Sequence, residues 1–431
     1  MRKTSSTLAL FLFLALGLAA KTPEFYGDVE PILNRSCVGC HRAGEIGPMA
    51  FTSYEQVRPW AKAIKNSVAT KRMPPWFADP AHGHFGNDRS LKPEEIATIN
   101  AWVDAGAPKG DESKKAKASV FVEGWNIPTP DVVLGMKEAF PVPANSKIDY
   151  QYIVVPTGFT EDKWVNMVEA RPSDRSVVHH LVVFIRDPKS KWLREAQPYV
   201  PFVPDRQGNA RRIDVGGGGN EILHTYTPGN LPDVWKPNQA KLIPAGADLV
   251  FQMHYTSTKK DTADLTKIGL IFSKQPVEER IMTVIGGTEA FKIPPGDPAY
   301  QASGTLTLPN DATLLSFFPH MHLRGKAFEY TLVAEGKEET LLKVNNYDFN
   351  WQLNYRLAEP RTLKGGSKIK VTATWDNSPN NKWNPDPNAT VTWGEQSWEE
   401  MAYGFMDFSI DARYDRRSWA QRKPLPAKSD E

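Results

Sequence analysis

The first part of the chain carries apolar residues at helical spacing. In PEFYGDVEPILNRS and again in LKPEEIATINAWVDAGAP they recur with the period of an amphipathic helix. Pro93 suits the first turn of the second helix, and Gly106 suits its end. The pattern therefore predicts a small all-α domain over residues 21–109.

Beyond this domain the hydrophobic pattern changes. Residues 110–127 begin as a charged linker, and short β-branched and aromatic runs follow, separated by Pro, Gly and Asn. These runs include YQYIVVPTGF, VVHHLVVFIRD, ADLVFQMHYTS, KIGLIFS, FEYTLVAE and KIKVTATWDNS. Short strands at this spacing predict antiparallel sandwiches rather than βαβ units. The length suffices for two sandwiches, over residues 128–280 and 281–418, before a polar tail at 419–431.

Residues 1–20, MRKTSSTLALFLFLALGLAA, have the pattern of a secretory signal peptide. Arg2 and Lys3 precede an apolar run that ends in small residues. An uncleaved anchor is the alternative interpretation. No other stretch of the sequence is long and apolar enough to cross a membrane. We therefore expect a periplasmic or secreted protein with no stable membrane insertion after cleavage.

The composition is that of a globular protein with nearly balanced charge. Hydrophobic residues make up 40% of the chain and aromatic residues 11%, which is enough for buried cores. With 52 basic and 50 acidic residues the formal net charge is +2, so we expect no nucleic-acid partner.

Both cysteines of the chain lie in one motif. The stretch RSCVGCHRAG holds Cys37, Cys40 and, directly after them, His41. Cys-X-X-Cys-His is the attachment pattern of c-type haem, in which the thiols form thioethers and the histidine is the proximal iron ligand. A redox dithiol and half of a zinc site are the alternatives, but a second cysteine pair and a thioredoxin-like βαβ context are missing. We therefore predict one covalently bound haem c.

The loop between this motif and the last predicted helix supplies candidates for the sixth iron ligand. The helical domain resembles class I cytochromes c, which place an axial methionine in such a loop, and the resemblance indicates Met73 in KRMPPWFADP. A thioether ligand raises the haem potential. Met49 is the runner-up, whereas His82 or His84 would give a low-potential bis-histidine site.

Five of the nine histidines lie inside apolar runs of the β region, where an unpartnered imidazole is costly to bury. They are His179, His180, His254, His320 and His322. A single core histidine usually only forms hydrogen bonds, but five such placements favour a metal site. Imidazole-rich ligand sets suit copper, zinc or non-haem iron, and ligation without cysteine or a nearby carboxylate favours copper.

Strand geometry limits how these histidines can share an ion. His320 and His322 are two positions apart, so in an extended chain their side chains point to the same face. His179 and His180 are adjacent and point to opposite faces. Both can bind one ion only if the strand ends or bulges there, or if each uses a different ring nitrogen.

In order and local context these motifs resemble the type II copper monooxygenases peptidylglycine α-hydroxylating monooxygenase and dopamine β-monooxygenase. The resemblance spans roughly residues 145–410 and implies two jelly-roll-like sandwiches that each bind one copper. It assigns the first copper to His179, His180 and His254, the last within QMHY. It assigns the second copper to His320, His322 and Met401, the last within GEQSWEEMAYGF. It also implies that the second copper activates O2, while the first stores an electron and passes it across a solvent cleft.

Other residues near these motifs have less defined roles. A thioether favours Cu(I), which supports Met401 as a ligand, although Met406 and Met321 compete with it and Met321 should face away from its flanking histidines. The resemblance suggests that Gln252 holds water near the first copper. His224 has no counterpart and is interpreted as a structural residue or one that supports a ligand.

The sequence departs from the peptide-amidating enzyme around the second copper. Phe318 occupies the position at which that enzyme has an arginine that binds the peptide carboxylate. Tyr403 and Phe405 stand where it has an asparagine and a tyrosine. Ala402 replaces a cysteine, so the disulfides of the animal enzymes are absent here. Peptidylglycine is therefore not the expected substrate, and a hydrophobic or aromatic compound is favoured.

The sequence thus predicts a monooxygenase that inserts one atom of O2 into a C–H bond of a small organic molecule. An external donor, either an ascorbate-like reductant or a redox protein, would supply electrons, and the fused haem would pass them on. A haem and copper protein for electron transfer or copper handling, without oxygenase activity, is the alternative. A plain binding scaffold is disfavoured because it would not need the soft ligand Met401.

Overall fold

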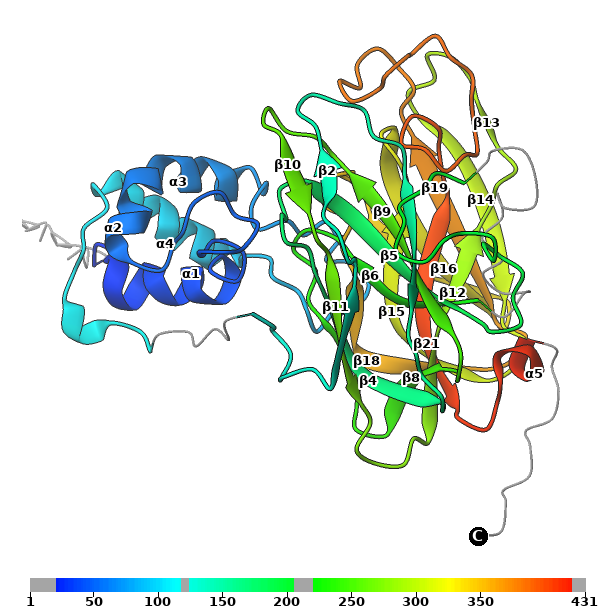
Figure 1. The fold of residues 1–431 in the computed structure, drawn as a ribbon. Coiled ribbons are helices and arrows are strands. Elements are labelled where there is room, and N and C mark those ends of the chain that lie inside the picture. The colour runs from blue at the N-terminus through cyan, green and yellow to red at the C-terminus, as the bar shows by residue number, and fades with distance from the viewer. Residues whose placement is uncertain (1–20, 118–123, 205–219, 421–431) are drawn as a thin grey trace, which may run out of the picture.

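The computed structural model describes residues 21–117, 124–204 and 220–420. The predicted signal peptide, part of the linker and most of the polar tail lie outside these residues. Within the described ranges no helix is long and apolar enough to cross a membrane. The described chain consists of a small helical domain and a larger β part that lies beside it (Figure 1).

The helical domain contains short α-helices around one apolar core. They are α1 (Glu30–Ser36), α2 (Tyr54–Val57), α3 (Ala61–Ala69) and α4 (Pro93–Asp104), with single turns at Phe25–Val29, Arg58–Trp60 and Glu112–Lys114. Phe25 and Trp102, which come from the two predicted helices, are both buried in this core. The first predicted helix is interrupted at Gly27, whose φ of 92° lies in the left-handed region that glycine adopts without strain. These helices alone do not identify a cytochrome c.

The first sandwich packs two sheets around an apolar core. One sheet has the order β3 (Gln151–Pro156), β9 (Asp248–Tyr255), β5 (Val178–Arg186) and β6 (Glu221–Tyr226). The facing strands are β1 (Val132–Gly135), β11 (Lys267–Phe272), β4 (Lys163–Arg171), β7 (Asp233–Val234) and β8 (Gln239–Ile243). Val168, Leu181 and Phe251 come from the two sheets and are buried in the core between them.

The second sandwich repeats this plan. One sheet has the order β14 (Tyr300–Thr307), β19 (Lys368–Trp375), β16 (Gly325–Ala334) and β17 (Lys337–Val344). The other contains β12 (Glu279–Gly287), β21 (Tyr403–Asp411), β15 (Ala312–His320) and β18 (Tyr355–Leu363). Phe317, Tyr330 and Phe408 lie in the buried core of this sandwich.

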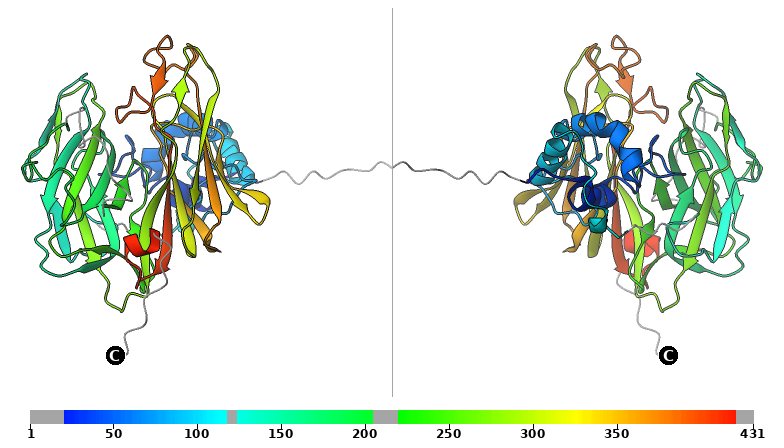
Figure 2. Two further views of the ribbon diagram at one scale, coloured as in Figure 1. Left: turned by 90° about the vertical axis from the view of Figure 1, so that its right-hand side faces the viewer. Right: turned by 90° about the vertical axis from the view of Figure 1, so that its left-hand side faces the viewer.

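The two sandwiches are joined through one continuous sheet and lie side by side (Figure 2). Strand β8 pairs in parallel with β12, with Gln239 opposite Glu279. The nine-stranded sheet that results contains strands of both sandwiches. Smaller pairs are formed by β2 (Phe140–Val142) with β10 (Thr262–Asp264) and by β13 (Lys292–Ile293) with β20 (Val391–Thr392), and a short helix α5 (Arg416–Ala420) follows β21. Each apolar run quoted above forms a strand, as predicted.

A loop of the helical domain, residues 74–91, packs against the second sandwich. Phe85 forms an isolated β-bridge with Leu357, and Ala78 forms one with Val344. The Trp76 ring lies 4.9 Å from the ring of Tyr355 on β18. The helical domain is therefore held by packed contacts as well as by the covalent linker.

Candidate metal centre

The first histidine triad lies where β5 pairs with β9. His180 is opposite His254, and the register shifts between Val178 and His180, so His179 is an extra residue in the strand. A bulge of this kind turns an adjacent side chain toward the same face. The Nδ1 atom of His180 lies 3.2 Å from Nδ1 of His179 and 3.3 Å from Nδ1 of His254. The bulge therefore brings the three predicted ligands together.

The environment of the triad suits a soft or borderline cation. All three imidazoles are buried, and one ligand nitrogen from each lies within 4.8 Å of the others. Burial lowers the pKa of His179 to about 3 and holds the pKa values of His180 and His254 well below the usual range, and neighbouring histidines lower them further. The rings are neutral at physiological pH, so their lone pairs are available to a metal. The donor set fits copper or zinc.

The second histidine pair stands at the end of β15. The Nδ1 atom of His320 lies 2.6 Å from Oε1 of Gln352, and Nδ1 of His322 lies 3.2 Å from the backbone oxygen of Glu399. These contacts orient each ring and leave its Nε2 atom for a metal. Nε2 of His322 is buried without a hydrogen-bond partner. Such an orphaned nitrogen fits a ligand position.

Three methionines near this pair occupy different environments. Met401 lines the same cavity as His320. Met321 and Met406, by contrast, are buried in the core of the second sandwich. Met401 is therefore the one of these three methionines that lines the cavity together with His320.

The two histidine sets lie next to each other. The ring centroids of His180 and His320 are 5.5 Å apart, and those of His320 and His322 are 5.2 Å apart. The ring of Tyr150 lies beside both sets, 4.4 Å from His254 and 6.4 Å from His322. In this structure the five imidazoles lie in one group, called the histidine neighbourhood below. The described residues therefore do not show the predicted solvent cleft between two separate sites.

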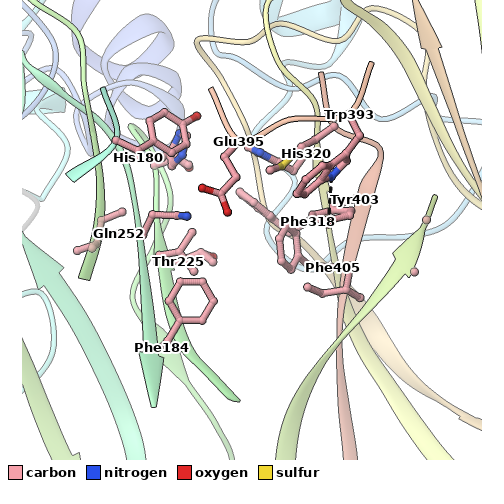
Figure 3. A pocket seen from close by; sticks show the side chains of 18 of the residues that line it. His180, Phe184, Thr225, Gln252, Phe318, His320, Trp393, Glu395, Tyr403 and Phe405 are labelled. Atoms are coloured by element: carbon pink, nitrogen blue, oxygen red, sulfur yellow. Dashed lines mark hydrogen bonds between the residues drawn. The ribbon is translucent and has the colours of Figure 1, made fainter. Parts of the chain in front are cut away.

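A cavity of about 280 Å³ opens at this neighbourhood, between the sandwiches. His180, Gln252, Thr225 and Phe184 lie on its first wall, and His320, Phe318, Tyr403 and Phe405 lie on its second (Figure 3). The predicted pocket residues Gln252, Phe318, Tyr403 and Phe405 therefore line one space with His180, His320 and Met401.

Polar groups of this cavity come from the segment before β21, from the start of β21 and from the end of β12 and the loop after it. The side chain of Glu395 points into the space between the walls (Figure 3). Tyr403 donates a hydrogen bond of 2.6 Å to Glu289 and accepts one of 3.1 Å from Trp393. No arginine or lysine is among the described residues that line the cavity. The cavity is mainly aromatic, and its charged groups are acidic.

Sequence reasoning assigned no role to a buried carboxylate, Glu400, that supports the second histidine pair. It accepts hydrogen bonds from the backbone N–H groups of His322 at 2.9 Å and Arg324 at 2.7 Å, and from the Trp375 indole at 2.9 Å. Burial raises the pKa of Glu400 to about 7 despite these donors. The sequence signal that could have identified Glu400 is its position directly before Met401. Its three hydrogen-bond donors could not be predicted, because they come from segments distant in the sequence.

His224 lies away from the histidine neighbourhood. It is buried on β6, and its Nδ1 atom is 2.6 Å from Oδ2 of Asp233. Burial alone would raise the pKa of Asp233, but His224 and Arg356 outweigh it and hold that pKa at about 2. His224 therefore contacts Asp233 in a polar network that also contains Arg356, 3.0 Å from Asp233, and that links β6 to neighbouring segments.

The predicted haem residues lie at the surface of the helical core. The thiols of Cys37 and Cys40 are free, and burial raises the pKa of the Cys37 thiol to about 12. The Nδ1 atom of His41 lies 3.1 Å from the Met49 backbone oxygen, and its ring stacks on Phe51 at 4.4 Å.

Three of the candidates for the sixth iron ligand lie at the start of loop 74–91 or within it, whereas the fourth, Met49, precedes α2. Met73 is half-buried and directly precedes the loop. His82 and His84 lie within the part of the loop that packs on the second sandwich, where the backbone oxygen of His84 accepts a hydrogen bond from Ala358.

The buried histidines predict a pH-dependent stability for the metal-free protein. Below about pH 6.5 the unfolded chain binds protons that the folded chain does not bind. The reason is that burial lowers the pKa of His320 to about 4 and holds that of His322 well below its usual range. Stability therefore falls as the pH drops below about 6.5. We expect urea unfolding of the metal-free protein to lose at least about 2 kcal/mol between about pH 7.5 and about pH 5. An unchanged unfolding free energy would contradict the neutral buried state.

Comparisons with solved structures give only distant likenesses. Two structures of PNGF-II share 11% and 9% sequence identity with this chain over 64% and 66% of its length, with TM-scores of 0.31 and 0.32. The chain spans 65% of each PNGF-II chain. A structure of allantoicase shares 7% identity over 55% of this chain and 81% of its own, with a TM-score of 0.16. TM-scores this low do not identify a fold.

A family model gives a more specific result. Residues 279–413 match the model of the copper type II ascorbate-dependent monooxygenase, C-terminal domain. The matched range begins with β12, the first strand of the second sandwich, and contains His320, His322 and Met401. The second sandwich thus matches the C-terminal domain of the copper type II ascorbate-dependent monooxygenases, which supports a copper-dependent, monooxygenase-type function.

Proposed function

We propose that the protein is an exported monooxygenase that uses two coppers and O2 to hydroxylate a C–H bond of a small organic molecule. The observation that carries this proposal is the cluster of five imidazoles beside one cavity between the sandwiches, a cavity that His180, His320 and Met401 line. The family match of the second sandwich supports the copper chemistry.

The ligand roles follow from the donor atoms. The first triad, His179, His180 and His254, would hold one copper through Nδ1 atoms that already converge. His320, His322 and Met401 would hold the other through two Nε2 atoms and a thioether sulfur. Bound copper would supply the one-electron redox chemistry that activation of O2 requires. The protein keeps these imidazoles neutral and excludes water by burial.

The cavity indicates the class of substrate. Aromatic side chains of Phe184, Phe318 and Phe405 favour an apolar or aromatic body, and about 280 Å³ suits a small molecule. Glu395 favours a hydrogen-bond donor or a positive group on that body. A substrate carboxylate, as in peptidylglycine, would meet acidic groups and no arginine or lysine among the described lining residues.

The segment from Cys37 to His41 fits a covalent haem c. Both thiols are free for thioethers. The contact between Nδ1 of His41 and the Met49 oxygen leaves Nε2 for iron, as is usual for a ligating histidine. Met73 is the proposed sixth ligand. A bound haem would carry single electrons from an external ascorbate-like reductant or redox protein toward the coppers.

Metal content and oxygen consumption test this function. We expect two coppers and one iron per chain, and substrate-dependent O2 uptake with ascorbate. Met401→Leu keeps the side-chain volume but removes the sulfur, so Cu(II) should be retained while O2 uptake falls on the order of 10–100-fold. Met406→Leu, in the core, is the matched control and should keep both. Zinc at full occupancy would refute the proposal, and bound copper with no substrate-dependent O2 uptake would favour electron transfer or copper handling.

A further inference from the structure

A second cavity, of about 370 Å³, lies between the helical domain and the first sandwich. Cys40 is on its helical wall, and Thr225 and Tyr226 of β6 are on the opposite wall. Thr225 and Tyr226 also line the cavity that holds His180 and His320. The end of β6 is therefore the partition between the haem-attachment motif and the histidine neighbourhood.

The β-ladder connects this partition directly to a metal-ligand candidate. Tyr226 is opposite Leu181 on β5, and Leu181 directly follows His180. Both Tyr226 and Leu181 are buried in the core of the first sandwich. Tyr226 is thus connected to His180 through its strand pairing with Leu181, the residue that follows His180 on β5.

Ion pairs hold the two walls of this second cavity together. Glu45 of the helical domain pairs with Arg175 and, at 3.7 Å, with Arg171 at the end of β4. Arg175 and Cys40 are near enough to Tyr226 to influence the pKa of its phenol, which burial raises to about 12. The Cys40 face is therefore docked on the first sandwich by these ion pairs as well as tethered by the linker.

We propose that Tyr226 is the contact through which electrons enter the first sandwich from a haem attached at Cys40. This inference rests on the haem and copper of the proposed function. A haem attached through a thioether to Cys40 would be held at the residue that lines the second cavity opposite Tyr226. One electron leaves ferrous haem, which becomes ferric, and reduces a cupric ion held by the triad to cuprous. No atom or proton is transferred, and an external one-electron donor reduces the haem again.

Rapid mixing of the oxidised holoprotein with less than one electron equivalent of dithionite, under argon, tests this route. Haem absorbance reports iron, and the cupric electron paramagnetic resonance signal reports copper. We expect haem reoxidation at a rate independent of protein concentration. Tyr226→Leu should lower this rate on the order of tenfold, equivalent to about 1.4 kcal/mol of barrier. Tyr226→Phe, which keeps the ring, should change it little.

Tyr300→Leu, on β14 of the second sandwich, is the matched control and should keep the wild-type rate. If Tyr226→Leu fails to fold or to bind copper, Tyr226→Met fills the same space without a ring and should show the same loss. Equal rates in the wild type and the Leu or Met variant would overturn the route. The route would also be overturned if haem reoxidation in the wild type showed no phase that is independent of protein concentration. Ascorbate-driven O2 uptake by that same protein would still support the proposed monooxygenase function.

Discussion

Replacing His322 with alanine is expected to remove about one of the two coppers and to abolish substrate hydroxylation. His322 is fully buried, its Nδ1 atom is engaged with Glu399, and its Nε2 atom has no other partner. Loss of this ring leaves only one imidazole and a thioether for the ion. Because loss of residues that merely support a ligand costs 10–100-fold in metal affinity, loss of the ligand itself should cost at least about 100-fold.

Copper content after gel filtration and product formation with ascorbate measure this effect. His84→Ala is the matched control, since it removes an exposed imidazole from loop 74–91. That variant should keep both coppers and full turnover. A His322→Ala protein with two coppers and wild-type turnover would exclude His322 as a ligand. Loss of both coppers would show that the adjacent histidine sets bind metal as one unit.

The second large effect is expected for Glu400→Leu, which should lower the free energy of unfolding by about 3–5 kcal/mol. The substitution leaves the N–H groups of His322, Arg324 and Trp375 buried without their acceptor. The backbone that carries His322 would also lose its support. We therefore expect weaker copper binding at the second histidine pair, with the first triad unaffected.

Urea unfolding and copper titration of the same preparations measure both effects. Glu338→Leu is the matched control, because Glu338 lies exposed on β17. Its unfolding free energy should stay within about 0.5 kcal/mol of the wild type. Glu400→Gln keeps the shape of the side chain and should fall between the two. A Glu400→Leu protein with unchanged stability would mean that the three donors find other acceptors.

Much of the fold could be predicted from the sequence, because patterns among nearby residues determine its helices and strands. The short apolar runs became β5, β9 and β19, and the helical spacing of LKPEEIATINAWVDAGAP became α4. The His-X-His spacing predicted two rings on one side of a strand. The ring centroids do lie 5.2 Å apart, but β15 ends at His320 and His322 lies beyond the strand. Such patterns depend on residues a few positions apart, so the sequence alone suffices to predict them.

The tertiary structure decided how distant segments meet. Only the pairing of β5 with β9 creates the register shift that brings the Nδ1 atoms of His179 and His180 to 3.2 Å from each other. Only the packing of the sandwiches brings the ring of His180 to 5.5 Å from that of His320. The contacts of Glu400 and Tyr226 likewise could not be predicted, because their partners lie on segments far away in the sequence. Residue types and spacing along the chain therefore determined the candidate ligands. Strand register and burial, which depend on contacts between segments remote in sequence, decided which of them share a site.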